Sequence, residues 1–223
     1  MTTLAERYQR IRASLPSGVQ LIAVSKMRSV AEIQALYDLG HRAFGENYPQ
    51  ELKEKQPLLP ADIEWHFIGH LQRSNVKHII AFTHLVHGVD SLLLLDELNK
   101  RAMTVGRIVD VLLQIHVAKE ESKHGFSPEE IRTFFKQPAI ILRWPNARVR
   151  GLMGMATNTD DRILISYEFA GQAGLFREIR DQGLYPVDQF CELSMGMSGD
   201  ADLAIAQGST IVRIGTAIFG ERS

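Results

Sequence analysis

Short apolar segments alternate along the chain with stretches whose apolar residues recur at helical spacing. Residues 4–15 form the first helical stretch, with charged residues between the apolar ones. Eight apolar segments have the length and composition of strands, and they are centred on residues 20–25, 42–45, 65–68, 85–89, 110–116, 149–153, 191–195 and 210–214. This alternation predicts βαβ units around a parallel sheet.

Two of the intervening helices have clear starting signals. Ser29 with Glu32 and Ser127 with Glu130 fit the capping box, in which the two residues exchange hydrogen bonds between side chain and backbone. Pro128 takes the first helical position, where the N–H that proline lacks is not needed. We therefore expect helices to begin directly after Ser29 and Ser127.

Glycines mark a helix end and a possible break. Gly40 stands where a left-handed residue would end the helix that begins after Ser29. Residues 92–103 and 162–181 also have helical spacing. Gly171 and Gly174 lie within the second of these stretches, and each costs a helix about 1 kcal/mol relative to alanine. The pattern therefore leaves open whether residues 162–181 form one helix or two.

Eight strands in regular succession predict an α/β fold, a closed (β/α)₈ TIM barrel with an N-terminal helix. The alternative is an open doubly wound sheet, but no Gly-x-Gly-x-x-Gly turn follows the first strand. The 223 residues lie near the lower end for such a barrel, for which roughly 250 is typical. They leave little room for a second domain, so we expect one barrel domain over residues 1–223.

Composition removes several classes of protein. Hydrophobic residues make up 45% and charged residues 23%, as in ordinary globular chains. The 25 Lys and Arg residues balance 26 Asp and Glu residues, so no nucleic-acid partner is indicated. No uncharged run approaches the roughly 20 residues that span a bilayer. Cys191 is the only cysteine, which excludes an internal disulfide and fits a reducing compartment. We expect a cytoplasmic protein.

Lys26 stands at the carboxyl end of the first predicted strand. In a barrel these strand ends gather on one rim, where such folds place their sites. The apolar run before Lys26 would carry its amine to the barrel mouth, where partial burial and nearby cations would favour Schiff-base reactivity. The alternative is an ordinary solvated lysine at a strand end.

Two glycine-bearing loops follow the seventh and eighth strands, at residues 194–199 and 215–220. This part of a barrel rim often binds phosphate, and Ser198 and Thr216 add hydroxyl donors to the backbone N–H groups. Asp200 and Asp202 would oppose a phosphate unless their side chains turn away. The alternative is a plain helix start, which uses such residues equally well.

Arg213 interrupts the apolar eighth strand. Period-two alternation places it on the same face as Ile211 and Gly215, inside the barrel. A buried arginine needs a partner, and two are open on the sequence: a pyridine nitrogen or a carboxylate on another strand.

His66 and His70 are four residues apart, a spacing that can ligate a metal on a helix. Here they fall on a strand end and its loop, which does not align them, and no acidic-histidine motif is near. We predict no metal site from this pair.

Six ordered blocks of sequence match one known family. They are Ala23-Val24-Ser25-Lys26, Phe44-Gly45-Glu46-Asn47-Tyr48, Trp65-His66-Phe67-Ile68-Gly69-His70-Leu71-Gln72, Gly151-Leu152-Met153, Leu193-Ser194-Met195-Gly196-Met197-Ser198 and Arg213-Ile214-Gly215-Thr216-Ala217-Ile218-Phe219-Gly220. Through them the chain resembles the pyridoxal phosphate homeostasis proteins over nearly its whole length.

The resemblance implies a fold-type III barrel like the N-terminal domain of alanine racemase, with pyridoxal 5′-phosphate (PLP) as cofactor. It implies a Schiff base on Lys26 and places Arg213 beside the pyridine nitrogen. The other residues that it implies are Ser198, Gly215 and Thr216 at the phosphate, and Asn47 and Met195 lining the pocket.

The function that the resemblance implies is non-catalytic: intracellular PLP homeostasis by buffering or delivery of the cofactor, which affects amino-acid and keto-acid balance. PLP-dependent apoenzymes are the expected recipients, and we expect a monomer with no nucleic-acid or membrane partner. One alternative is a PLP-dependent racemase or related enzyme, but alanine racemases add a C-terminal β-domain, and this chain stops at Ser223. Another is a cofactor-free Schiff-base aldolase acting on sugar phosphates.

Overall fold

The strands close into a parallel barrel. The computed structural model describes residues 2–116, 124–137, 140–183, 185–186 and 188–221. Each strand pairs in parallel with the next along the chain, and β8 pairs with β1, which excludes the open sheet. The strands are β1 (Gln20–Val24), β2 (Ala43–Glu46), β3 (Glu64–Phe67), β4 (Thr83–Val89), β5 (Val109–Gln114), β6 (Ala147–Met153), β7 (Glu192–Ser194) and β8 (Ile211–Ile214). All eight predicted strands are confirmed.

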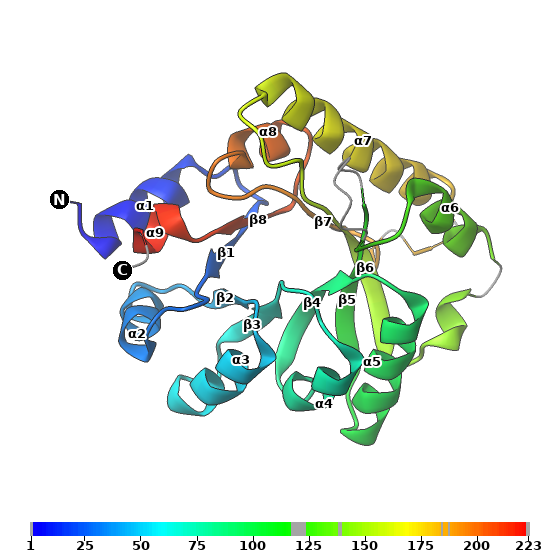
Figure 1. Ribbon diagram of the computed structural model, residues 1–223, viewed down its shortest axis with the longest axis horizontal. Coiled ribbons are helices and arrows are strands. Elements are labelled where there is room, and N and C mark those ends of the chain that lie inside the picture. Colours follow the sequence, from blue (N-terminus) through cyan, green and yellow to red (C-terminus); the bar gives the residue numbers. More distant parts are fainter. Residues whose placement is uncertain (1, 117–123, 138–139, 184, 187, 222–223) are drawn as a thin grey trace.

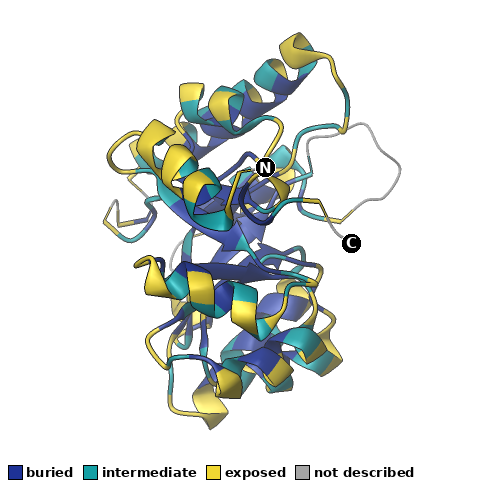
Figure 2. Cartoon of the chain, turned by 90° about the vertical axis from the view of Figure 1, so that its left-hand side faces the viewer, coloured by how far each residue is buried: buried dark blue, intermediate teal, exposed yellow. Residues whose placement is uncertain are grey.

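Helices surround the barrel (Figure 1). Their inward faces are buried and their outward faces exposed (Figure 2). The α-helices are α1 (Leu4–Ser14), α2 (Val30–Asp38), α3 (Pro49–Lys55), α4 (Val76–Ile79), α5 (Leu92–Thr104), α6 (Pro128–Lys136), α7 (Arg162–Asp181), α8 (Ala201–Ala206) and α9 (Thr216–Phe219). Short 3₁₀ turns are η1 (Gln56–Leu58), η2 (Arg73–Asn75) and η3 (Ile140–Arg143). None of the helices in the described ranges is both long and apolar enough to cross a membrane.

The predicted helix ends are present. The capping boxes at Ser29 and Ser127 both form, so α2 and α6 begin directly after them. Gly40 has a φ of 92°, the left-handed conformation that glycine adopts without steric cost. A third capping box, between Thr3 and Glu6, starts α1.

The stretch containing Gly171 and Gly174 is one helix, α7, which runs without a break for 20 residues. The structure thus resolves the question that the glycines left open. Phe169 and Phe176 are among the residues that α7 buries, and packing of this apolar face outweighs a propensity cost of about 1 kcal/mol per glycine.

Two apolar regions follow from strand alternation. The larger one lies between the barrel and the helices. The smaller one fills the barrel interior and consists of Ile22, Ala43, Leu85, Leu112, Met153 and Ile211. The buried polar side chains of the barrel strands include His66, His87, Ser194 and Arg213.

The first and last helices lie side by side (Figure 1). Arg7 of α1 donates from Nε to the Ile218 carbonyl oxygen at 2.7 Å and from Nη2 to that of Phe219 at 3.2 Å. These bonds satisfy carbonyl groups of α9 that the short helix leaves unpaired. The N-terminal helix is therefore part of the barrel's closure.

Candidate functional site

The residues predicted for the site follow the carboxyl ends of four strands. Lys26 follows β1, Asn47 follows β2, Ser198 follows β7, and Gly215 with Thr216 follows β8. Lys26 and Asn47 are half-buried, whereas Ser198 and Thr216 are exposed. The barrel closure brings β1, β7 and β8 together, so residues far apart in sequence share one rim.

A buried ion network fixes the strand end that carries Lys26. Lys55 of α3 donates to Glu46 Oε1 at 2.8 Å and to the Ser25 carbonyl oxygen at 2.8 Å. The Ser25 hydroxyl donates to the same Glu46 oxygen at 2.6 Å, and Glu51 also pairs with Lys55. Ser25 and Glu46 are fully buried. The residue before Lys26 is therefore held on both its backbone and its side chain.

Burial raises the pKa of Glu46, while Lys55 and Ser25 oppose that shift. Sequence reasoning missed this network. Its one local signal is the i,i+4 spacing of Glu51 and Lys55 on a helix, and only the three-dimensional fold brings Glu46 to them.

The residue after Lys26 has an unusual backbone. Met27 has a φ of 58°, the single non-glycine residue with positive φ among the described residues. Side chains other than glycine enter this region at a cost of roughly 1–2 kcal/mol. The Met27 N–H donates to Glu51, which compensates part of that cost. Lys26 thus lies between Ser25, which the ion network holds in place, and Met27, whose backbone is strained.

The two glycine loops meet at the rim. The Gly215 N–H donates to Ser198 Oγ at 3.3 Å, which joins the loop after β7 to the end of β8. A Cβ on Gly215 would lie 3.2 Å from Val24 Cβ, so glycine allows β8 to approach β1 at this point. Gly196 has a φ of 90°, which turns the first loop. Ser198 and Thr216 therefore belong to one surface.

The two acidic residues beside these loops differ in where their carboxylates lie. Asp200 Oδ1 accepts from the Met197 N–H at 2.6 Å. Asp202 pairs with Arg162 of α7. Asp202 is thus turned away from the loop after β7, whereas the Asp200 carboxylate binds a backbone N–H within that loop and leaves a negative charge close to Ser198.

Arg213 lies inside the barrel and is almost fully buried. It donates to the carbonyl oxygens of Ser194 and Gly154 at 2.9 Å and 3.0 Å, and to Ser194 Oγ. Burial lowers its pKa to about 10, and Asp200 partly opposes this shift. No ion pair among the described residues includes Arg213, so the interstrand carboxylate partner is not formed. The guanidinium is held by neutral acceptors.

A chain of hydrogen bonds continues from Arg213 across the barrel interior. Ser194 Oγ lies 2.9 Å from His87 Nδ1, and His87 Nε2 lies 3.0 Å from His66 Nδ1. All three side chains are fully buried. Burial lowers the pKa of His87 well below its usual value and that of His66 to about 3, so both imidazoles are neutral. We call His66, His87, Ser194 and Arg213 the interior chain.

A cavity of about 370 Å³ opens at the same rim. Asn47 lines it, and Asn47 Oδ1 is buried without a hydrogen-bond partner. Met195 does not line it. Its side chain is fully buried in the core outside the barrel, because it alternates with the inward-facing Ser194. Met197 lines the cavity instead, and contact between Met195 and a cofactor stays a prediction.

The structure separates His66 from His70. His66 belongs to the interior chain, whereas His70 lies at the rim with Nδ1 3.0 Å from Asp90 Oδ2. His124 Nδ1 lies 3.8 Å from the same oxygen. His70 and His124 border the cavity. The cluster of His70, Asp90 and His124 was missed from the sequence, because its members follow three different strands.

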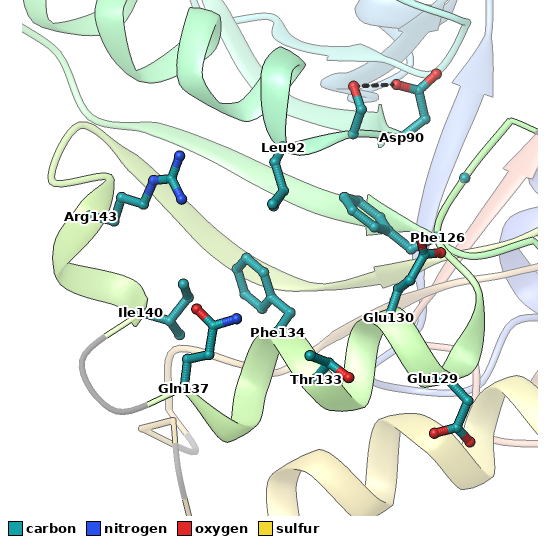
Figure 3. Close-up of a pocket in the computed structure, with 12 residues that line it drawn as sticks. Asp90, Leu92, Phe126, Glu129, Glu130, Thr133, Phe134, Gln137, Ile140 and Arg143 are labelled. Carbon is teal, nitrogen blue, oxygen red and sulfur yellow. Dashed lines mark hydrogen bonds between the residues drawn. The ribbon is translucent and has the colours of Figure 1, made fainter.

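A second and larger cavity, of about 510 Å³, lies on the barrel flank between α5 and α6 (Figure 3). Its acidic groups already have partners. Glu130 caps Ser127, Glu129 pairs with Arg132, and Asp90 pairs with His70. None of the predicted site residues lines it, so its size alone assigns it no role.

The whole chain matches one family. The family model for the alanine racemase N-terminal domain matches residues 1–223. A pyridoxal phosphate homeostasis protein from Aquifex aeolicus is 39% identical over 228 residues, covering 100% of this chain and 96% of that protein. One from Pasteurella multocida is 40% identical over 211 residues, covering 92% and 88%.

Solved structures agree with this match. PipY from Synechococcus elongatus, solved without PLP, superposes with a TM-score of 0.90 at 35% identity and covers 98% of this chain and 100% of that chain. The structure of the same protein with PLP bound superposes with a TM-score of 0.88. Alanine racemase from Bartonella henselae, 18% identical with a TM-score of 0.73, shares the fold.

The closed barrel and the full-length match define a member of the family of the alanine racemase N-terminal domain. Within that family, identity near 40% over almost the entire length is decisive. The chain belongs to the pyridoxal phosphate homeostasis proteins, as its sequence motifs indicate.

Proposed function

We propose that this chain binds PLP at the carboxyl rim of the barrel and acts in PLP homeostasis without catalysing a reaction. The observation that supports this most directly is that Lys26 and the contact between Ser198 and Gly215 share one rim, with Arg213 inside the barrel two residues before Gly215. The relatives named for PLP homeostasis and the PLP-bound PipY structure support the choice of ligand.

The residues present fit PLP in their chemistry. Lys26 offers an amine for a covalent link to the aldehyde that PLP supplies. Ser198 and Thr216 offer hydroxyls, and the glycine loops offer N–H groups, to a phosphate. Arg213 offers a charged donor to the ring nitrogen. Asn47 Oδ1 at the cavity has no hydrogen-bond donor among the described residues, so it is available to accept a hydrogen bond from the ligand.

Arg213 supports the proposed role without catalysis, although it does not establish that role alone. PLP supports carbanion chemistry best when its ring nitrogen is protonated. A guanidinium beside that nitrogen disfavours the added proton by charge repulsion. Arg213 is anchored on three sides to neutral acceptors, so it stays in place. Alanine racemases work with an arginine at this nitrogen, so a direct assay has to decide the matter.

The test of the site is an absorbance spectrum of the purified protein with and without borohydride, followed by peptide mapping. We expect one pyridoxyl group per chain, on Lys26. Lys55 is the matched control, because it is buried and held by Glu46 and the Ser25 carbonyl oxygen. Lys26→Ala should remove the absorbance band and leave folding intact, since a half-buried rim lysine adds little packing. A label mainly on Lys77, or none at all, would contradict the site.

We further propose that the protein is a cytoplasmic monomer that passes PLP to apoenzymes. The single cysteine, Cys191, which forms no disulfide, fits a reducing compartment. Light scattering during gel filtration tests the monomer. Mixing the loaded protein with a PLP-dependent apoenzyme, with and without a separating membrane, shows whether transfer needs direct contact.

A further inference from the structure

The opposite end of the barrel, where the strands begin, carries a cluster that the proposed function does not use. Glu64 is the first residue of β3, His66 follows it by two, and His84 is the second residue of β4. Each offers one ligand atom, and these three atoms lie within 4.8 Å of one another. Parallel pairing of β3 with β4 brings the cluster together.

His66 supplies the observation that points to a ligand. Its Nδ1 faces His87, but its Nε2 is buried without a hydrogen-bond partner. Buried polar atoms in native proteins are almost always satisfied. Among the described residues, no hydrogen bond joins any two of Glu64, His66 and His84. The three groups therefore converge without satisfying one another.

The cluster opens on a small polar cavity of about 80 Å³. His66 and His84 line it, Glu64 does not, and the other lining residues are Gln20, Leu85, Asp110, Arg150 and Glu192. A cavity of this size has room for water. Arg150 lies 3.8 Å from Asp110. The Asp110 carboxylate therefore balances part of the arginine charge and reduces its repulsion of a cation in the cavity.

We propose that Glu64, His66 and His84 form a site for a divalent transition-metal cation of the zinc class. Imidazole nitrogens and a carboxylate oxygen are the ligands that zinc prefers, at about 2.0–2.2 Å, with water in a fourth position. Tetrahedral bonds of that length place ligand atoms about 3.3 Å apart. The ligand atoms lie within 4.8 Å of one another, so side-chain rotations have to bring them closer, and the exposed His84 has room for such a rotation.

The contrast with the rim cluster supports this choice. His70 and His124 both turn Nδ1 toward one oxygen of Asp90, so hydrogen bonds already explain that grouping. Both side chains there are about half exposed, at 49% and 57%. At the cluster of Glu64, His66 and His84, Gln20 donates a long hydrogen bond of 3.5 Å to Glu64 Oε2. The buried His66 Nε2 has no hydrogen-bond partner among the described residues, so hydrogen bonding does not account for the position of that imidazole.

The surroundings would also orient the buried ligand. When a cation occupies His66 Nε2, the proton of that imidazole sits on Nδ1 and is donated to His87 Nε2, 3.0 Å away. Metal-binding histidines regularly donate their second nitrogen in this way, and the hydrogen bond fixes the ring. The interior chain thus provides the support that a histidine ligand requires.

The experiment is a Co²⁺ titration of the tag-free protein, followed through the visible d–d bands and then by Zn²⁺ competition. We expect one Co²⁺ per chain, displaced by Zn²⁺. Glu64→Gln and His84→Gln should each weaken binding about tenfold or more. They carry the test because both residues are outside the core, whereas a change at the buried His66 endangers folding.

The matched control is the double variant His70→Gln with His124→Gln, which removes the other cluster of two histidines and a carboxylate. We expect its Co²⁺ spectrum to equal that of the unaltered protein. Loss of the bands in this variant, or no Co²⁺ bands in the unaltered protein, would overturn the proposal. Because the site lies at the opposite rim from Lys26, its failure leaves the proposed PLP site untouched, and the reverse also holds.

Discussion

Ser198 and Thr216 are the hydroxyls that distinguish a phosphate surface from a plain loop. Each hydrogen bond to a charged group is worth about 1.5–3 kcal/mol. We expect Ser198→Ala with Thr216→Val to weaken PLP retention more than either change alone, because both hydroxyls are assigned to one phosphate. Gel filtration after loading measures the PLP retained. Ser209→Ala is not a suitable control, because Ser209 is buried and its replacement would disturb packing. The exposed Ser14→Ala, on α1, serves instead. Unchanged PLP retention in the double variant would mean that the phosphate binds elsewhere on the rim.

His41 makes folding stability depend on pH. It packs between Tyr8 and Phe44, and burial lowers its pKa from 6.5 to about 4. The unfolded chain therefore binds a proton below pH 6.5 that the native chain refuses until about pH 4. The stability that the neutral imidazole contributes is present above the higher pKa and is lost as pH falls through this window.

Between about pH 7.5 and about pH 5 this group lowers the free energy of unfolding by about 2 kcal/mol. The measurement is urea unfolding of the unaltered protein and of His41→Asn at both pH values. We expect the stability difference between the two proteins to shrink by that amount at the lower pH. A difference that stays constant would mean that folding does not lower the pKa of His41.

Single residues of the site could be predicted only where the chain itself carries a signal. Lys26 and Arg213 stand out because a charge ends or interrupts an apolar strand. Lys55 and His87 could not be found in this way. Lys55 sits on a short helix among other charges, and His87 contacts Ser194 from the opposite side of the barrel.

At the scale of elements, Lys55 fastens α3 to the ends of β1 and β2. Removing one partner of a buried ion pair leaves an uncompensated charge and costs about 3–5 kcal/mol. We expect Lys55→Met to lower the free energy of unfolding by that amount in urea unfolding. Adding Glu46→Gln should restore part of the loss, because the remaining buried group is then neutral.

The control is Lys53→Met on the same helix, where the side chain is exposed. Its expected effect is within about 0.5 kcal/mol. If Lys55→Met lowers the free energy of unfolding no more than Lys53→Met does, the network does not hold the strand ends.

The elements themselves followed closely from the sequence. Strands and long helices were predictable because burial imposes a regular spacing, and capping residues set the starts of α2 and α6. The short helix α3 was not predicted, because its start has no side-chain cap. That α7 is continuous also escaped the pattern, since its packing outweighs the two glycines.

At the scale of the whole molecule, the proposed function predicts that the loaded protein turns over no common amino acid. Arg213 weakens the electron sink, and racemisation needs a positioned base on each face of the cofactor. Incubation with L- and D-amino acids, followed by chiral chromatography and keto-acid detection, tests this. Steady turnover at about 1 s⁻¹ or faster would make the protein an enzyme.

Should turnover occur, the rim offers two imidazoles to examine first, His70 and His124. Both border the cavity that Asn47 lines. If the double variant His70→Gln with His124→Gln loses the turnover, one of these histidines acts as a base. If turnover persists, Lys26 is the base to test. A purified alanine racemase, assayed under the same conditions, is the positive control.

The interior chain has a consequence that follows from its arginine end. A guanidinium only donates, so no proton can leave the chain through Arg213, and the chain cannot conduct. It can only be polarised in one of two directions: Ser194 donates toward His66, or His66 donates toward Ser194. It is a two-state dipole that joins the two rims of the barrel. The nitrogen that carries the proton on His87, which ¹⁵N chemical shifts distinguish, reports which direction holds. A cation on His66 Nε2 would select the second direction, because it leaves the proton of that imidazole on Nδ1, from which His66 donates to His87.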